Sequence, residues 1–205
     1  METARRTNAG DLNVGGASFS DTERIGPQND SIASLLHGEM TEVARTKRMF
    51  HAASQAATTT TIALATTYTG LCLSNPASNT KDLIPRILSV ALSVAPAGIA
   101  PMALGGGMTV AGVVTHTTPL STFNNVLGDG GAATGLADGA ATLPAAPRVI
   151  MPILGGFTAG ALFGTSPAIV NIGGGIIIPP GGYVFVYTLT VAVGLFGIWW
   201  EEVDR

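Results

Sequence analysis

Two kinds of hydrophobic periodicity divide this chain near residue 55. Over residues 31–53, apolar residues recur at spacings of three and four, which predicts an amphipathic helix. Asp30 or Ser31 can cap its start, and a cluster of cations at 45–48 suits the negative end of its dipole. Two interpretations stay open, a helix that packs on its own domain or an anchor that bundles with its own copies. The apolar positions are Ile32, Leu35, Leu36, Met40, Val43 and Phe50.

From Thr58 onward, apolar residues alternate with smaller or polar ones, which is the period of a β-strand. The clearest case is the segment 88–94, in which Leu and Val alternate with Ser and Ala until Pro96 stops the pattern. The spacing of strands and turns predicts a mainly β fold, an antiparallel sandwich. The predicted strands lie at 58–64, 71–73, 88–94, 108–116, 148–154, 156–163, 168–172, 175–178, 183–193 and 195–203.

These patterns predict three parts. Residues 1–29 are rich in small polar residues and have no sustained period, so we expect an extended or disordered arm, free or ordered on a neighbouring subunit. Residues 30–54 form the helix or anchor segment. Residues 55–205 form the β-sandwich, with a long connection rich in Gly, Ala and Asp at 124–146.

Charge is distributed unevenly along the chain. Between Ile87 and Trp200 there are only three formally charged residues, Asp129, Asp138 and Arg148. Soluble domains carry roughly 25% charged residues, so a monomer could not cover itself with charge from this stretch. We therefore expect much of it to be buried against lipid or other protein copies, with the three charged residues marking the parts that meet water.

A membrane span is one way to bury this stretch. The uncharged run from Tyr183 to Trp200 is just long enough for a transmembrane helix, and it ends in an aromatic pair. However, large and small residues alternate along it, Gly194 and Gly197 interrupt it, and the residues that follow are mostly acidic. These features favour strands, and a small membrane protein with a span at 183–200 stays as the alternative.

Burial against other protein copies accounts for more of the sequence. The polar faces of the predicted strands carry Thr and Ser instead of Lys and Glu. Hydroxyl groups can be buried if they are hydrogen-bonded, whereas an unpaired charge costs several kcal/mol. Since obligate homo-oligomer interfaces resemble a core cut in half, the sequence favours a homo-oligomer.

No pattern of catalytic, cofactor-binding or metal-binding residues is present. His37, His51 and His116 are far apart and form no metal-binding spacing, and the single Cys72 lies in an apolar run typical of a buried residue. No Gly-rich phosphate loop and no nucleophile elbow occur. Glu201 and Glu202, on opposite faces of a continued strand, are expected to be a solvated tail. We therefore predict that the chain is not an enzyme and has no cofactor.

Two further classes are disfavoured. The net charge of −3 argues against a nucleic-acid-binding protein, which would normally carry a basic patch. No apolar segment follows the basic pair at residues 5–6 within the first 30 residues, so we expect synthesis in a cytoplasm rather than export.

Two segments resemble a known group of proteins. The stretch 174–186 reads as an apolar strand, a Pro-Gly-Gly turn and an aromatic strand, and residues 69–76 lead through an Asn-Pro turn into the strand at 83–94. This arrangement is similar to the jelly-roll structural proteins of bacteriophage virions. The resemblance covers about 58–203, while the connection at 124–146 and the N-terminal arm and helix depart from it.

The resemblance implies a jelly-roll-like antiparallel sandwich with an N-terminal arm and one α-helix. It implies a homo-oligomer, a trimer, located in the virion as a capsid cement, head-decoration, collar or fibre protein. Residues 1–53 would then bind capsid, portal or neighbouring copies. These families carry no catalytic residues that could be transferred to this chain.

A β-sandwich module that binds glycans is a third hypothesis. Aromatic residues clustered on exposed loops would favour it. In this chain Tyr183, Tyr187, Trp199 and Trp200 stand in predicted strands, and only Phe123 borders the long connection.

Overall fold

The computed structural model describes residues 24–25, 31–32, 39–62, 64–108, 114–127, 131–157 and 168–205. The chain divides into two units, Met1–Glu39 and Met40–Arg205. In the first unit, β1 (Arg24–Ile25) pairs with β2 (Ser31–Ile32) in an antiparallel ladder. The rest of the predicted arm lies outside the described residues.

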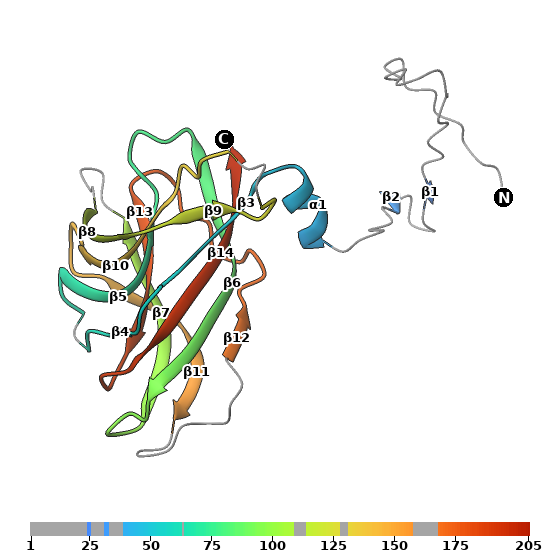
Figure 1. Ribbon diagram of the computed structural model, residues 1–205. Helices are drawn as coiled ribbons and strands as arrows, with labels where there is room; N and C mark the ends of the chain where they lie inside the picture. The colour runs from blue at the N-terminus through green and yellow to red at the C-terminus, as the bar shows by residue number, and fades with distance from the viewer. Residues whose placement is uncertain are drawn as a thin grey trace. The chain divides into compact units, whose positions relative to one another are not determined.

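Two antiparallel sheets form the second unit (Figure 1). We call them sheet I and sheet II. Sheet I has the order β11 (Arg148–Phe157), β7 (Ala100–Met108), β13 (Gly182–Thr188), β5 (Thr67–Ser74), β10 (Leu136–Thr142) and β8 (Thr115–Leu120). Sheet II has the order β12 (Ala168–Asn171), β6 (Lys81–Val94), β14 (Val193–Asp204), β3 (Met49–Ala53) and β9 (Thr122–Asn124), and β4 (Thr58–Thr59) pairs with the start of β14.

The predicted sandwich is confirmed: the chain is mainly β, with two antiparallel sheets. From β5 to β7 and again from β11 to β14, each successive strand moves to the other sheet. This switching is characteristic of jelly-roll sandwiches. Pro96 ends β6 as the sequence predicted, and the run from Tyr183 to Trp200 forms β13 and β14. Among the described residues, no helix is long and apolar enough to cross a membrane.

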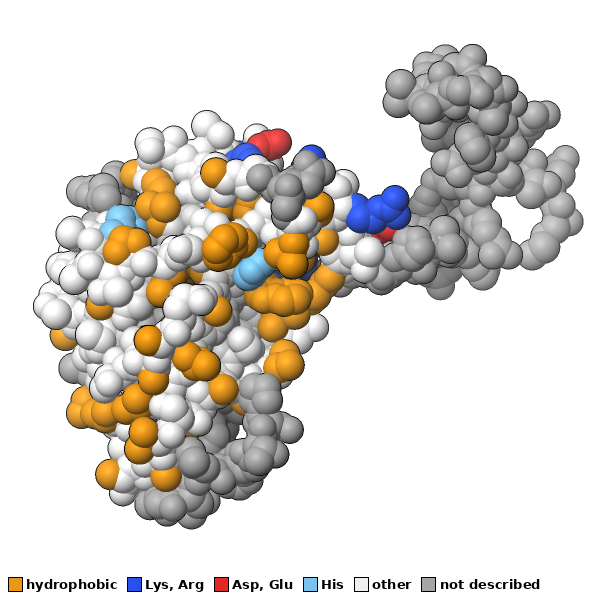
Figure 2. Space-filling view, viewed as in Figure 1, with side chains coloured by type: hydrophobic (Ala, Val, Ile, Leu, Met, Phe, Trp, Pro, Cys, Tyr) orange, Lys and Arg blue, Asp and Glu red, His pale blue; other side chains and the backbone are white. Residues whose placement is uncertain are grey.

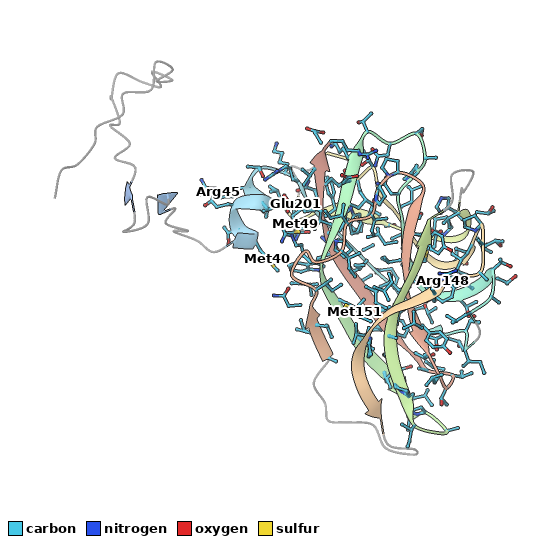
Figure 3. All side chains as sticks on the ribbon, turned by 180° about the vertical axis from the view of Figure 1, so that it is seen from behind. Met40, Arg45, Met49, Arg148, Met151 and Glu201 are labelled. Atoms are coloured by element: carbon cyan, nitrogen blue, oxygen red, sulfur yellow. The ribbon has the colours of Figure 1, made fainter. Side chains whose placement is uncertain are left out.

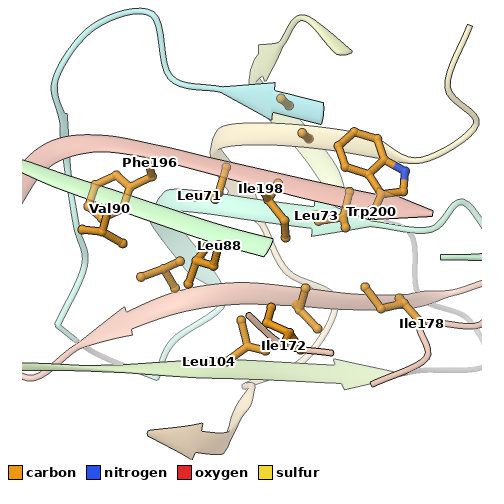
Figure 4. Packing of buried hydrophobic residues seen from close by; sticks show 14 of the residues in the cluster. Leu71, Leu73, Leu88, Val90, Leu104, Ile172, Ile178, Phe196, Ile198 and Trp200 are labelled. Atoms are coloured by element: carbon orange, nitrogen blue, oxygen red, sulfur yellow. The ribbon is translucent and has the colours of Figure 1, made fainter. Parts of the chain in front are cut away.

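The main core lies between the sheets because alternate residues of each strand point inward. β14 contributes Phe196, Ile198 and Trp200, which meet side chains from β6 and from sheet I (Figure 4). Complete burial of one such side chain stabilises the fold by about 1.5–3 kcal/mol. The other core residues labelled in Figure 4 are Leu71, Leu73, Leu88, Val90, Leu104, Ile172 and Ile178.

A second core covers the middle of the outer face of sheet I. β13 is therefore buried on both faces, with Val184 and Val186 in the main core and Tyr183 and Phe185 in the second. The glycines of β7 make room for these rings, since a Cβ on Gly105 would stand closer than 3.0 Å to the ring of Phe185. The other members of this second core include Tyr68, Cys72, Val114, Ala141 and Leu143.

The predicted helix over 31–53 is wrong in extent. Of the residues described in this range, α1 (Glu39–Arg45) is helical, 31–32 belong to β2, and β3 of sheet II begins at Met49. Lys47 ends the helix with a left-handed φ of 62°, and the amide of Arg48 donates to the carbonyl of Val43 at 3.2 Å. This is the Schellman type of helix end, which usually places Gly in the left-handed position. Because Lys stands there instead, the end of the helix carries no stop signal in the sequence.

The predicted connection at 124–146 is also wrong, because β10 lies within it and pairs with both β5 and β8. A second strand that the periodicity did not predict is β7, which runs through Pro101 and three consecutive glycines. Conversely, residues 175–178 make only an isolated bridge between Ile178 and Leu83. Parts of the strands predicted at 108–116 and 156–163 lie outside the described residues.

The close packing of Phe185 on Gly105 gives a stability prediction. Gly105→Ala should lower the free energy of unfolding by about 2 kcal/mol or more, because the ring or the strand must move. Gly131→Ala is the matched control, since a Cβ there meets nothing within 4 Å. Denaturant unfolding of both variants measures the effect, and equal stabilities would contradict this packing.

Candidate functional site

The outer face of sheet II is the main exposed surface of interest, and we call it the apolar face. Residues two apart on a strand share a face, so the strand register places its side chains in rows. The first row crosses all five strands, and the second lies two residues further along. The first row is Asn171, Ile87, Trp199, His51 and Phe123, the second is Ile169, Ser89, Gly197 and Ala53, and the third is Ala91 and Leu195.

Large apolar side chains on this face are left exposed. Trp199 is 40% exposed, Leu195 45%, Phe123 52% and Ile169 68%. Figure 2 views the molecule from this side and shows hydrophobic side chains gathered over sheet II. The three rows contain no charged residue. Contiguous exposed apolar patches on monomeric proteins commonly mark interaction sites.

An aromatic group forms the middle of the first row. The ring of His51 lies between Phe123 and Trp199, with centroid distances of 5.8 and 6.2 Å respectively. His51 Nδ1 also forms a 2.8 Å hydrogen bond with Asn125 Oδ1, which fixes the ring. This group was not predicted, because exposed aromatic residues were expected on loops. The available signal was the alternation of Leu195, Gly197 and Trp199 with the apolar residues Phe196, Ile198 and Trp200, which puts the two sets on opposite faces of a strand.

A charge cluster borders the apolar face at its α1 end. Glu201 is buried, and its carboxylate pairs with Arg86 and, at 3.4 Å, with Arg48. Figure 3 shows Glu201 near Met49 at the end of the sandwich where α1 joins. The buried carboxylate is neutralised, and since two cations share it, these three groups together keep one positive charge at the margin of the face.

The prediction that Glu201 and Glu202 form a solvated tail is wrong, because both side chains are buried. The two carboxylates have different partners. Glu202 accepts hydrogen bonds from the backbone amides of Thr134 and Gly135, at 2.7 and 2.9 Å, and from Trp200 Nε1 at 3.2 Å. Lys81 Nζ lies 3.7 Å from Glu202 Oε2. These bonds hold the segment before β10 against the end of β14.

Asp138 was expected to meet water, and this expectation is wrong. Its side chain is fully buried on β10, with Oδ2 2.6 Å from His116 Nδ1 and with no hydrogen-bond partner for Oδ1 among the described residues. Burial raises the pKa of Asp138, while the hydrogen bond and the charge of His116 lower it. Arg148 is exposed as predicted, and Asp129 lies outside the described residues.

Cys72 is the register partner of Asp138 on β5. Its thiol is completely buried, as the sequence predicted, and burial followed by the nearby Asp138 raises its pKa far above the usual value. Such a thiol stays protonated and is a poor nucleophile. In the described part of the chain, no group of three or more His, Cys, Asp or Glu side chains could hold a metal ion. His37 lies outside it.

Comparison with known proteins adds no relative: no protein-family model, no characterised protein and no solved structure matches this chain. The resemblance to phage jelly-roll proteins therefore stays a prediction from its short motifs. The apolar face is the candidate functional site, and its chemistry is that of a neutral surface that can be buried against a partner.

The buried carboxyl group gives a pH prediction. Because the pKa of Asp138 is raised in the folded state, the folded chain binds more protons than the unfolded chain above about pH 4. The contribution of Asp138 to stability is therefore present below its unfolded pKa and is lost as pH rises through its folded pKa. Asp138→Asn, which keeps an oxygen acceptor for His116, should make the free energy of unfolding fall less between pH 4 and 7.

Denaturant unfolding at several pH values measures this difference. Asp204→Asn, which removes one exposed carboxylate from the end of β14, is the control for a general change in net charge. A pH dependence in Asp138→Asn equal to that of the parent chain would contradict the assignment.

Proposed function

We propose that this chain is a structural protein of a virus particle that works as a homo-oligomer. The observation that carries the proposal is the apolar face, an uncharged and exposed sheet surface in a chain with very few charges after Ile87. A surface of this kind costs free energy in water and gains it on burial, at about 25 cal/mol per Å². The resemblance to phage virion proteins favours a trimer that decorates, cements or extends a particle.

The N-terminal part is proposed to attach the oligomer to capsid, portal or other virion proteins. Thirteen of the charged residues lie within 1–48, so this part has the polar character of an exposed binding segment. Since β3 begins at Met49 and belongs to sheet II, we limit the attachment segment to the residues before it.

Glycan binding is a second candidate function, favoured by one observation. Trp199 and Phe123 are exposed on either side of His51 on the outer face of sheet II. Exposed aromatic rings can stack on the apolar faces of sugar rings. The proposal of self-association is preferred because the exposed apolar surface extends beyond this row to Leu195 and Ile169.

Light scattering on the full chain without detergent tests the self-association. We expect a mass that is a multiple of 20.7 kDa and that persists on dilution to micromolar concentration. A monodisperse monomer would contradict the proposal.

Protein identification in purified virus particles tests the virion role separately. We expect peptides of this chain in particles banded on a density gradient, in a fixed ratio to the capsid protein. Recovery of the chain only from the soluble host lysate, with none in the particles, would be evidence against this role.

A further inference from the structure

We infer that the apolar face is the surface on which a second copy of this chain binds, with the row through Trp199, His51 and Phe123 as its aromatic contact. This inference rests on the proposed homo-oligomer and assigns its contact surface. Other exposed apolar residues, such as Val149 and Ile150 on β11 and Ile99 and Leu189 in turns, form no continuous rows.

The relief of the face suits another copy of itself. Three of the four residues of the second row, Ser89, Gly197 and Ala53, are small, and larger side chains stand around them. A Cβ on Gly197 would lie 2.7 Å from Ser89 Oγ, so a larger residue does not fit at this position. This part of the face therefore stays lower than the large side chains around it. Packed sheets lie about 10 Å apart with interdigitated side chains, and each copy supplies both projections and a hollow.

The exposed area is of the order that an interface core requires. Trp199, Phe123, Leu195 and Ile169 each leave roughly half of their surface exposed, which amounts to roughly 300–400 Å² of apolar area. A stable interface buries about 800 Å² on each partner, with an apolar core and a more polar rim. The small and polar residues of the same rows extend the surface, and aromatic residues are enriched at such centres.

The charge distribution favours an identical partner over a charged one. The three rows carry no charge, so two copies can meet without repulsion between like charges. At the margin, Glu201 is compensated within its own chain by Arg48 and Arg86. A charged protein partner would lose the hydration of its charged groups on this face and find no opposite charge within the three rows in return.

Introducing a charge on the apolar face tests this inference. Trp199→Glu and Leu195→Glu place a carboxylate in the proposed contact, and we expect each to weaken self-association at least tenfold. The control is Ile150→Glu, because Ile150 is also an exposed apolar residue on a strand but lies on β11 of sheet I. Sedimentation velocity over a concentration series gives the mass, and circular dichroism verifies the fold.

A milder variant covers the case in which a carboxylate prevents folding. Phe123 lies on the edge strand β9, and Phe123→Thr replaces it with a residue that strands tolerate well. We expect a measurable shift from oligomer to smaller species in this variant, with unchanged circular dichroism.

The outcomes separate the inference from the proposed function. If the parent chain is an oligomer and the variants of the apolar face keep its mass, the inference fails while the homo-oligomer stands. If the parent chain is a monomer, both fail. A monomeric chain that binds an immobilised glycan, with binding lost in Trp199→Glu, would overturn the inference in favour of the second candidate function.

Discussion

β14 divides its side chains between two surfaces, and the rest of the structure depends on this division. Phe196, Ile198 and Trp200 enter the main core, while Leu195 and Trp199 stand on the outside. β14 pairs with β6 on one side and with β3 on the other, so its backbone amide and carbonyl groups are hydrogen-bonded within the sheet and need no polar side chain. Its last residues then hold Thr134 and Gly135 through Glu202.

The shortage of charge after Ile87 has two physical explanations in this fold. One part is absorbed within the chain itself, because the middle of sheet I is covered on both faces and β13 is buried throughout most of its length. Hydroxyl groups share in this burial, since Thr60 and Thr188 are buried and hydrogen-bonded to each other at 2.6 Å. The apolar face stays exposed, but much of this charge-poor stretch is already buried within the chain, which composition alone did not indicate.

Periodicity predicted the sandwich well where one face of a strand is buried and the other is small or polar, as in β6. It failed where a decisive contact is made with a distant residue. β3 continues the helical spacing of α1, and only its pairing with β14 makes Phe50 and Ala52 inward-facing strand residues. Asp138 seemed a solvated turn residue because its partner His116 comes from another strand. Whether Trp199 faces the core or the solvent depends in the same way on the strand register.

The two tryptophans of this chain are neighbours in sequence but belong to opposite environments. Trp200 is completely buried and donates a hydrogen bond to Glu202, whereas Trp199 is partly open to solvent. A register shift in the pairing of β14 with β6 falls between them. As a consequence, the intrinsic fluorescence of the chain combines one emitter shielded from solvent quenchers until the sandwich opens and one that quenchers can reach in the folded state. Folding and coverage of the outer face can therefore be followed separately, without any added label.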